Sequence, residues 1–311
     1  MWISALGVDE PAGSAAIVPG MQQPIPYPFR ASEALDEGLL TFHQLRRFHT
    51  AVYPGVWVAR GADLSTADLA RAAWLWSGRR GVVAGLSASA LHGAQWIEPN
   101  TPPELVHTNR RPPWLIVVRS DRLLDGETQF IGDLPVTTPA RTAFDLGRRL
   151  RPGSSVPRID ALMNATDVKA EEIDAVIARH PRVRGLRNLR AVLKIVDGGA
   201  ESPYESKTRM LLLRNGFPRP QTQILVRDHD GFVVARIDMG WPEWQVGVDF
   251  DGAHHWTDPR QRDKDIERYA LLADLGWADI RLTSGLLHTN PRGFLDRVGA
   301  ALVARGCPRT W

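Results

Sequence analysis

A group of carboxylates lies between and after two short apolar runs in the last third of the chain. The runs at 233–237 and 244–250 are separated by glycine, proline and glutamate, a pattern typical of a β-hairpin with an irregular turn. Asp238 follows the first run, whereas Asp249 and Asp251 flank the last residue of the second. Because successive strand side chains point to opposite faces, Asp249 and Asp251 share one face. We therefore expect three carboxylates at one edge of a sheet.

These carboxylates need a chemical reason to be close, because aspartate is depleted in strands and clustered negative charges repel each other. A hard divalent ion, Mg²⁺ or Mn²⁺, bound by a few carboxylates and waters would neutralise them. His254 and His255 follow just beyond and add two candidate proton-transfer groups. The alternative is structural, since Asp251-Gly252 alone is a turn signal and Asp238 alone can end a strand.

The spacing resembles the PD-(D/E)XK nuclease superfamily, in particular its very-short-patch-repair endonuclease-like branch. In that pattern an aspartate ends one strand, an acid follows on the next, and an Asp-Gly-x-x-His segment comes after; here these are Asp238, Asp249 and residues 251–255. The chain departs from the pattern twice. Asp249 stands where glutamate is usual, and Asp251 stands where the general pattern has lysine, as is common in this branch.

The resemblance implies Mg²⁺- or Mn²⁺-dependent hydrolysis of DNA phosphodiester bonds. Asp238 and Asp249 would hold the metal, and Asp251 or Glu205 would assist. His255, or else His254, would act as general base or protonate the leaving oxygen. On the helix expected over 263–275, Lys264 and Arg268 are candidates to replace the absent lysine. Without the resemblance, Glu205 is an ordinary first-turn carboxylate of a helix at 203–215.

Length and composition limit the kind of protein that can carry this site. A chain of 311 residues with 43% hydrophobic residues predicts two packed domains and excludes a wholly disordered protein. The single cysteine, Cys307, excludes a disulfide framework or a cysteine-rich zinc site, which favours a reducing, cytoplasmic setting. No apolar run is long enough for a membrane span, and the first residues lack a secretory signal. The net charge of +3 and isoelectric point near 9.3 permit nucleic-acid binding.

We expect a tail at 1–23, a DNA-binding domain at 24–150, a helical connector at 151–197 and the nuclease-like domain at 198–311. In the first domain, Ser32 and Thr41 are expected to cap two helices, the second being Phe42–Phe48, and 53–58 is expected to turn into a strand. Helix, helix and β-wing is the order of a winged helix-turn-helix. Arg46 and Arg47 would then face phosphate or a groove. The alternative is a plain helical hairpin with solvated arginines.

The first domain resembles the AbiEi-like antitoxin family over about residues 30–150. The matching segments are 38–41, 53–58, 87–93 and 134–146. The resemblance implies operator DNA as a partner and allows a cognate toxin encoded nearby. The stretch between Thr41 and Tyr53 is too short for the family's additional recognition helix. Either Phe42–Phe48 reads DNA or DNA binding is weakened.

A basic stretch precedes the nuclease-like domain. From Arg179 to Lys194 there are six lysines or arginines and no acid, and Arg187, Arg190 and Lys194 share one helical face. This face is either a solvated surface or a contact for DNA phosphates.

The chain is thus expected to be an α/β (α+β) protein with a winged helix and a PD-(D/E)XK fold. Its expected function is a DNA-binding, metal-dependent endonuclease. The alternatives are a non-catalytic, antitoxin-like regulator with a degenerate nuclease fold, and an interaction scaffold that does not touch DNA.

Overall fold

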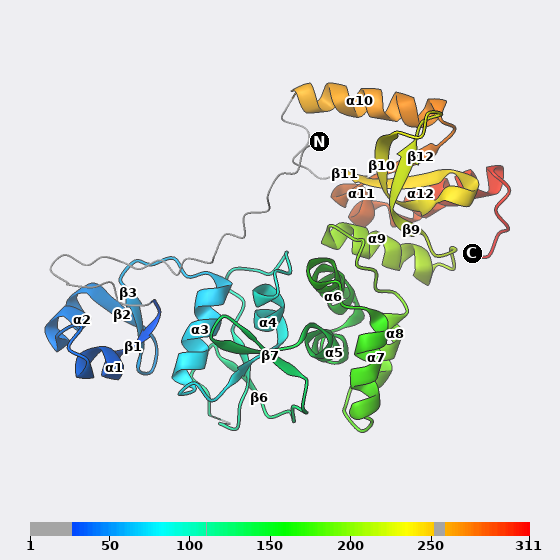
Figure 1. The fold of residues 1–311 in the computed structure, drawn as a ribbon. Coiled ribbons are helices and arrows are strands. Elements are labelled where there is room, and N and C mark those ends of the chain that lie inside the picture. Colours follow the sequence, from blue (N-terminus) through cyan, green and yellow to red (C-terminus); the bar gives the residue numbers. More distant parts are fainter. Residues whose placement is uncertain (1–26, 110, 252–258) are drawn as a thin grey trace. The chain divides into compact units, whose positions relative to one another are not determined.

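The computed structural model describes residues 27–109, 111–251 and 259–311 (Figure 1). The tail expected at 1–23, and both His254 and His255, lie outside the described residues. The chain forms two compact units. Unit 1 contains Ile97–Thr142 and the described residues up to Leu91, and unit 2 contains His92–Trp96 and Ala143–Trp311. The division falls at Thr142 and Ala143, so the stretch expected to be a connector packs within unit 2.

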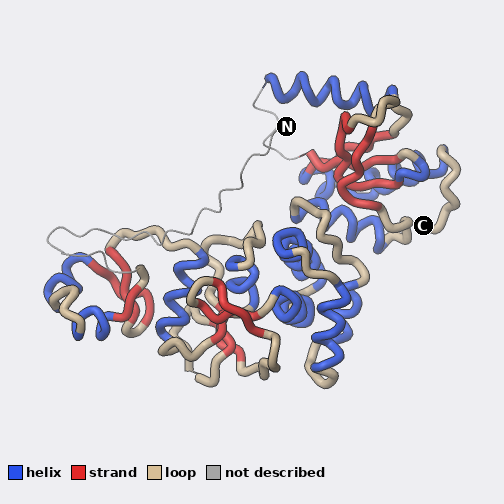
Figure 2. Tube along the Cα trace, viewed as in Figure 1, coloured by secondary structure: helices blue, strands red, loops and turns tan. Residues whose placement is uncertain are grey.

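Both units mix helices with β-sheets, which confirms the expected α+β class at this level (Figure 2). No helix among the described residues is long and apolar enough to cross a membrane.

The first part of unit 1 is a small helical unit with a hairpin. The elements are β1 (Phe29–Arg30), α1 (Ala31–Asp36), α2 (Phe42–Phe48), β2 (His49–Tyr53) and β3 (Val56–Ala59), with the three strands in the order β1-β3-β2. Thr41 caps α2 as expected, because its side chain accepts the Gln44 N–H at 3.3 Å and Gln44 returns a bond to the Thr41 N–H. The expected cap Ser32 is wrong, since α1 begins at Ala31, with Arg30 at the cap position.

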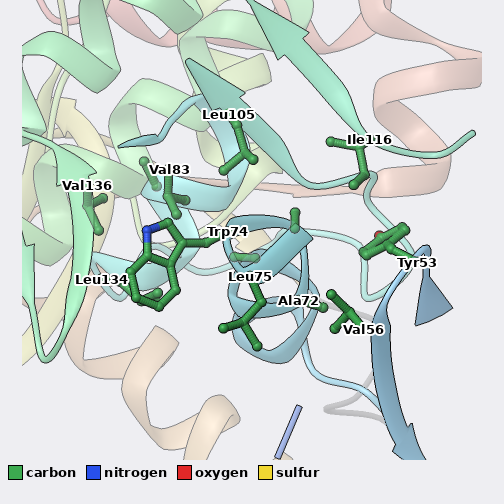
Figure 3. Close-up of a cluster of buried hydrophobic side chains, with 13 residues drawn as sticks. Tyr53, Val56, Ala72, Trp74, Leu75, Val83, Leu105, Ile116, Leu134 and Val136 are labelled. Atoms are coloured by element: carbon green, nitrogen blue, oxygen red, sulfur yellow. The ribbon is translucent and has the colours of Figure 1, made fainter. Parts of the chain in front are cut away.

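The second part of unit 1 is a five-stranded sheet with two helices. The elements are α3 (Thr66–Trp76), β4 (Val82–Val83), α4 (Gly85–Leu91), β5 (Glu104–Val106), β6 (Val117–Arg119), β7 (Thr128–Ile131) and β8 (Leu134–Thr137), and the strand order is β6-β5-β4-β8-β7. Figure 3 shows the core, where Trp74 and Leu75 of α3 pack with Val83, Leu105 and Val136 of the sheet. Burial of these side chains holds the helix on the sheet.

Helix α5 (Pro139–Arg149) begins with a proline, which is favourable at the first position of a helix. Its Arg141 is buried and forms an ion pair with the equally buried Glu127, while Asp145 pairs with Arg148 at 2.8 Å. Buried charges of this kind are stable only when they are paired.

Three further helices, α6 (Pro152–Thr166), α7 (Ala170–Arg179) and α8 (Leu186–Leu193), begin unit 2. They support α9 (Pro203–Arg214), mainly through α6. Between these two helices Asp160 accepts hydrogen bonds from the Asp197 N–H at 2.8 Å and the Ser206 hydroxyl at 2.6 Å, and pairs with Arg209. Both Asp160 oxygens therefore have donors.

A four-stranded sheet forms the rest of unit 2. The elements are β9 (Gln221–Arg227), β10 (Val233–Trp241), the 3-10 turn η1 (Pro242–Trp244), β11 (Val246–Asp251), α10 (Pro259–Asp274), β12 (Ala278–Thr283), α11 (Ser284–Thr289) and α12 (Pro291–Ala304). The strand order is β12-β11-β10-β9, with β11 and β12 parallel and the other pairs antiparallel. The expected hairpin of β10 and β11 is confirmed. Gly240 permits its close approach, since a Cβ there would lie 2.3 Å from the Val246 carbonyl oxygen.

Helices pack on this sheet through two buried clusters. Phe294, Val298 and Leu302 of α12 pack against a cluster that includes Met239 and Val248. Leu272 of α10 packs against a second cluster around β9 and β10. The two buried clusters fix the strands whose ends carry the carboxylates.

Candidate active site on the four-stranded sheet

Asp238 and Asp249 lie where β10 and β11 stop pairing through their backbones. The ladder ends at Met239 opposite Val248. Beyond that pair, the Asp238 N–H donates to Asp249 Oδ1 at 2.9 Å, and the Phe250 N–H donates to Asp238 Oδ2 at 2.7 Å. At this position a backbone N–H of each strand donates to a side-chain carboxylate of the other strand, where a regular ladder would have a backbone carbonyl oxygen as acceptor. These reciprocal bonds hold the two carboxylates at the junction of the strands.

Glu205 joins this pair from helix α9. Ser202 caps the helix and places Glu205 in its first turn, where only 5% of the residue is exposed. Glu205 Oε2 accepts the Glu201 N–H at 3.0 Å. Burial, and then the negative charge of Asp238, raise the pKa of Glu205 to about 7. The structure therefore brings Glu205 close enough to Asp238 for the two charges to interact.

The same effects act on Asp238. Burial and the charge of Asp249 raise the pKa of Asp238 to about 6, although the Phe250 N–H and the nearby Arg268 and Arg236 favour its charged form. At neutral pH the site therefore holds more negative charge than its surroundings compensate.

Arg268 of α10 supplies one positive charge to the site. Its Nη2 donates to Asp249 Oδ2 and, at 2.6 Å, to the Arg236 carbonyl oxygen. Arg268 thus approaches the carboxylates, as expected for one of the two basic residues of this helix. The side chain of Lys264, the other candidate, lies outside the described part.

Asp251 has a different partner from the one expected. It forms an ion pair with Arg281 of β12 at 2.7 Å. Parallel pairing sets Arg281 opposite Asp249, two residues before Asp251 on β11. The guanidinium of Arg281 also lies over the Tyr269 ring, 4.0 Å from its centroid. Asp251 is therefore already neutralised by a neighbour from the next strand.

Sequence reasoning missed a further carboxylate, Asp279 of β12. It lies opposite Gly247 in the parallel ladder. Burial and the charge of Asp249 raise the pKa of Asp279 to about 7. Both of its carboxylate oxygens are buried and have no hydrogen-bond partner among the described residues. The available signal was an aspartate between the apolar residues Ala278 and Ile280, because strands rarely contain one.

The donor set can be tested against the metal that the resemblance implies. Within the described residues, no three or more histidines, cysteines or acids are arranged to hold a metal ion. Mg²⁺, however, is usually bound by only one or two carboxylates together with waters and substrate. Asp238 and Asp249 offer two hard oxygen donors, and a cation would relieve the repulsion that raises the pKa of Asp238. The residues therefore fit Mg²⁺ or Mn²⁺, with Arg268 as a competitor for Asp249.

The predicted DNA-contacting residues lie on two surfaces, one in each unit. In unit 1, Arg46 and Arg47 are exposed on α2, and their guanidinium groups lie 5.8 Å and 5.2 Å from the ring centroids of Phe42 and Phe48. Both arginines are therefore available to a ligand, held over aromatic rings of their own helix.

In unit 2 the structure brings Arg187, Arg190 and Lys194 together on the exposed side of α8 and adds a residue that sequence reasoning missed, Arg214. We call this surface the basic hollow; its lining consists of Arg187, Arg190, Ala191, Lys194, Ile195, Leu213 and Arg214. Glu205 and Arg214 lie near opposite ends of α9, about 13 Å apart along its axis.

Comparisons with known proteins add little to this picture. The chain is 30% identical over 172 residues to the uncharacterized proteins MT2308 and Rv2248 of Mycobacterium tuberculosis, from strains CDC 1551 and H37Rv. The alignment covers 53% of this chain and 63% of each relative, so the match spans less than two thirds of the relatives' length. No known family matches the sequence. No solved structure matches it either.

Proposed function

We propose that unit 2 is a metal-dependent nuclease that hydrolyses DNA phosphodiester bonds. The observation that carries the proposal is the convergence of three carboxylates from three separate elements: the buried Glu205 and Asp249, and the half-buried Asp238, whose charge raises the pKa of Glu205 and whose own pKa is raised by Asp249. Such a group lowers stability unless a ligand compensates it, and strongly shifted pKa values cluster at functional sites. The α+β fold and the hairpin with its carboxylates agree with the resemblance to the PD-(D/E)XK superfamily.

Each residue has a distinct role in this proposal. Asp238 and Asp249 hold Mg²⁺ or Mn²⁺, which when bound activates water and stabilises charge on the phosphoryl group. Glu205, with a pKa of about 7, holds or releases a proton near neutral pH beside Asp238. Arg268 balances the charge of Asp249. Asp251 keeps β12 in register through Arg281. The general-base role suggested for His255 or His254 rests on the resemblance alone.

DNA is held by positive side chains in both units under this proposal. In unit 1 the contact is made by Arg46 and Arg47 of α2, and in unit 2 by the four cations of the basic hollow. On each surface, contacts with phosphates position DNA without reading its sequence. The single cysteine, Cys307, supports a reducing, cytoplasmic setting as part of this proposal.

A second candidate function is a non-catalytic, antitoxin-like regulator that binds operator DNA and a toxin encoded nearby. The specific observation in its favour is that arginines already neutralise two of the acids, Arg268 at Asp249 and Arg281 at Asp251. The helix–helix–hairpin order of the first part of unit 1, with Arg46 and Arg47 exposed, suits the DNA-binding part of this role.

A cleavage assay decides between the two functions. Purified protein is incubated with Mg²⁺ or Mn²⁺ and with duplex, mismatched or single-stranded DNA. The nuclease proposal expects cleavage by wild type, a loss of about 100-fold or more in Asp238→Asn, and wild-type activity in the matched control Asp296→Asn, whose carboxylate is exposed on α12. DNA binding without cleavage, and without stabilisation by metal, would leave the regulator as the better account.

Salt-dependent binding tests the DNA surface itself. Replacing Arg46 and Arg47 by alanine should weaken binding and reduce the slope of log affinity against log salt by about one to two. The control replaces Arg292 and Arg297, both exposed on α12, and should leave the slope unchanged. An unchanged slope in the α2 variant would move the DNA contact to another surface. If the wild type shows no salt-dependent binding at all, both candidate functions are wrong.

A further inference from the structure

Trp96 of unit 2 has much of its indole ring exposed. Among the tryptophans that the structure describes, Trp96 and Trp114 are exposed, and the others are buried or half-buried. The exposed fraction of Trp96 is 51%. Its Nε1–H donates to the Glu201 carbonyl oxygen at 3.2 Å. Because this bond satisfies the one polar group of the indole, the exposed part of the ring is available for stacking.

Glu201 joins Trp96 to the carboxylate site. The Glu201 N–H donates to Glu205 Oε2 at 3.0 Å, so one residue and two hydrogen bonds separate the indole from the carboxylate of Glu205. The Trp96 Nε1 and Glu205 Oε2 atoms therefore lie at most about 10 Å apart. Along DNA each strand carries a phosphate about every 3.4 Å of helix axis, so this distance corresponds to about three nucleotides. A strand whose phosphate reaches the carboxylates thus has bases within reach of Trp96.

The backbone holds Trp96 in an unusual conformation. Its φ is 65°, in the left-handed region that is unfavourable for a bulky residue. Such strain persists only where the surrounding structure imposes it, and it gathers at binding and active sites. The bond to Glu201 holds the side chain, and Glu201 is itself fixed by two hydrogen bonds from Arg236, each of 2.8 Å. The ring is therefore placed before a ligand arrives, which reduces the entropy lost on binding.

We propose that Trp96 stacks on an unpaired base next to the phosphodiester bond at the carboxylate site. The inference rests on the proposed nuclease function and narrows its substrate to DNA with single-stranded or mismatched bases. An aromatic side chain can stack on any unpaired base, because every base has a π-face. In an intact duplex the bases are already stacked on one another, and taking one out costs free energy.

DNA binding by the full chain in EDTA tests the proposal, because the proposed cleavage needs metal. The probes are a single-stranded oligonucleotide and a fully paired duplex. Trp96→Ala should weaken binding of the single strand by about tenfold and change binding of the duplex by less than about twofold, since only the single strand offers a free base. Trp96→Phe keeps an aromatic ring and should retain most of the affinity for the single strand.

A matched control and a second measurement complete the test. Trp114→Ala removes an exposed indole from unit 1 and should bind both probes like the wild type. An oligonucleotide with 2-aminopurine at an unpaired position reports stacking directly, because stacking quenches its fluorescence. Saturating wild type should quench this signal more than saturating Trp96→Ala does. Measured with the wild type, the quenching tests the contact even if Trp96→Ala fails to fold.

The outcomes separate this inference from the nuclease proposal. Equal losses on single-stranded and duplex DNA in Trp96→Ala, unchanged binding by that variant, or no quenching by saturating wild type would each overturn the stacking contact. A wild type that does not bind single-stranded DNA would also overturn it. Binding of the single strand that depends on Trp96, without cleavage in Mg²⁺ or Mn²⁺, would instead retain the contact and remove the nuclease. Cleavage that is indifferent to Trp96 would retain the nuclease and remove this substrate class.

Discussion

Helix α9 carries two buried charged residues, Glu205 and Arg209, that lie about one turn apart and meet opposite surroundings. Arg209 pairs with Asp160 of α6, which also accepts hydrogen bonds from Asp197 and Ser206. This paired cluster balances one positive charge against one negative charge. Glu205 instead faces Asp238, which in turn faces Asp249.

The carboxylate site is not balanced in the same way. Glu205, Asp238, Asp249 and Asp279 influence one another, and Arg268 is the described cation that pairs with one of them. A buried, balanced pair holds two helices together, whereas buried like charges oppose folding. We infer from this difference that the Asp160–Arg209 cluster stabilises the fold and that the carboxylate site binds a ligand. Variants in each of the two clusters test this inference.

The largest effect is expected from breaking the paired cluster. Arg209→Met leaves the carboxylate of Asp160, which is 1% exposed, without its counter-charge. We expect the free energy of unfolding, measured with urea, to fall by about 3–5 kcal/mol. Arg214→Met, on the exposed side of the same helix, should change it by less than about 0.5 kcal/mol. Similar small losses in both variants would remove the distinction between the two clusters.

The next largest effect is a loss of stability as the pH rises, whereas in ordinary acid denaturation stability is lost as the pH falls. The folded-state pKa of Glu205, about 7, lies above its usual 4.5. The protonated form is therefore favoured by folding, and this contribution is fully present below pH 4.5 and lost as pH rises through about 7. In EDTA, wild type should lose about 3 kcal/mol relative to Glu205→Gln between these limits. Parallel pH profiles for the two proteins would show that Glu205 is not in a repelling site.

A smaller effect is expected at Arg268, the arginine that pairs with Asp249. Arg268→Met should lower the free energy of unfolding in EDTA by about 1–2 kcal/mol, because Asp249 loses its partner. Added Mg²⁺ should then raise the melting temperature more than it does in wild type, since the cation no longer competes with Arg268. Arg236→Met, which breaks an exposed pair with Glu201, should cost less than about 1 kcal/mol. A metal response identical in wild type and Arg268→Met would contradict the competition.

The smallest effect is expected from removing one of the repelling charges. Asp238→Asn keeps an oxygen that can accept the Phe250 N–H and loses a negative charge beside Asp249. In EDTA we expect a gain of about 0.5–1 kcal/mol in unfolding free energy. The variant should also lose any stabilisation by Mg²⁺ or Mn²⁺. A clear destabilisation, compared with Asp296→Asn as control, would mean that Asp238 serves structure as Asp160 does.

Local signals in the sequence were sufficient for many elements of the fold. Thr41 predicted the start of α2, because a side-chain oxygen satisfies the free N–H groups of the first turn. Alternation of apolar and acidic residues predicted β11 and placed Asp249 on the hairpin next to Asp238. These interactions join residues that are close in the chain, so they can be predicted without knowing how distant elements pack.

Only the tertiary structure decided which charges meet. Asp251 was grouped with the metal site by sequence, but Arg281, thirty positions away, pairs with it because β12 adds parallel to β11. The same strand brings Asp279 beside Asp249, and the end of α9 brings Arg214 to the face of α8. Caps, turns and alternation depend on a few neighbouring residues, whereas the partner of a buried charge depends on how distant elements pack. The sequence by itself therefore determined the start of α2, the hairpin and its two aspartates, and packing alone decided how their charges are compensated.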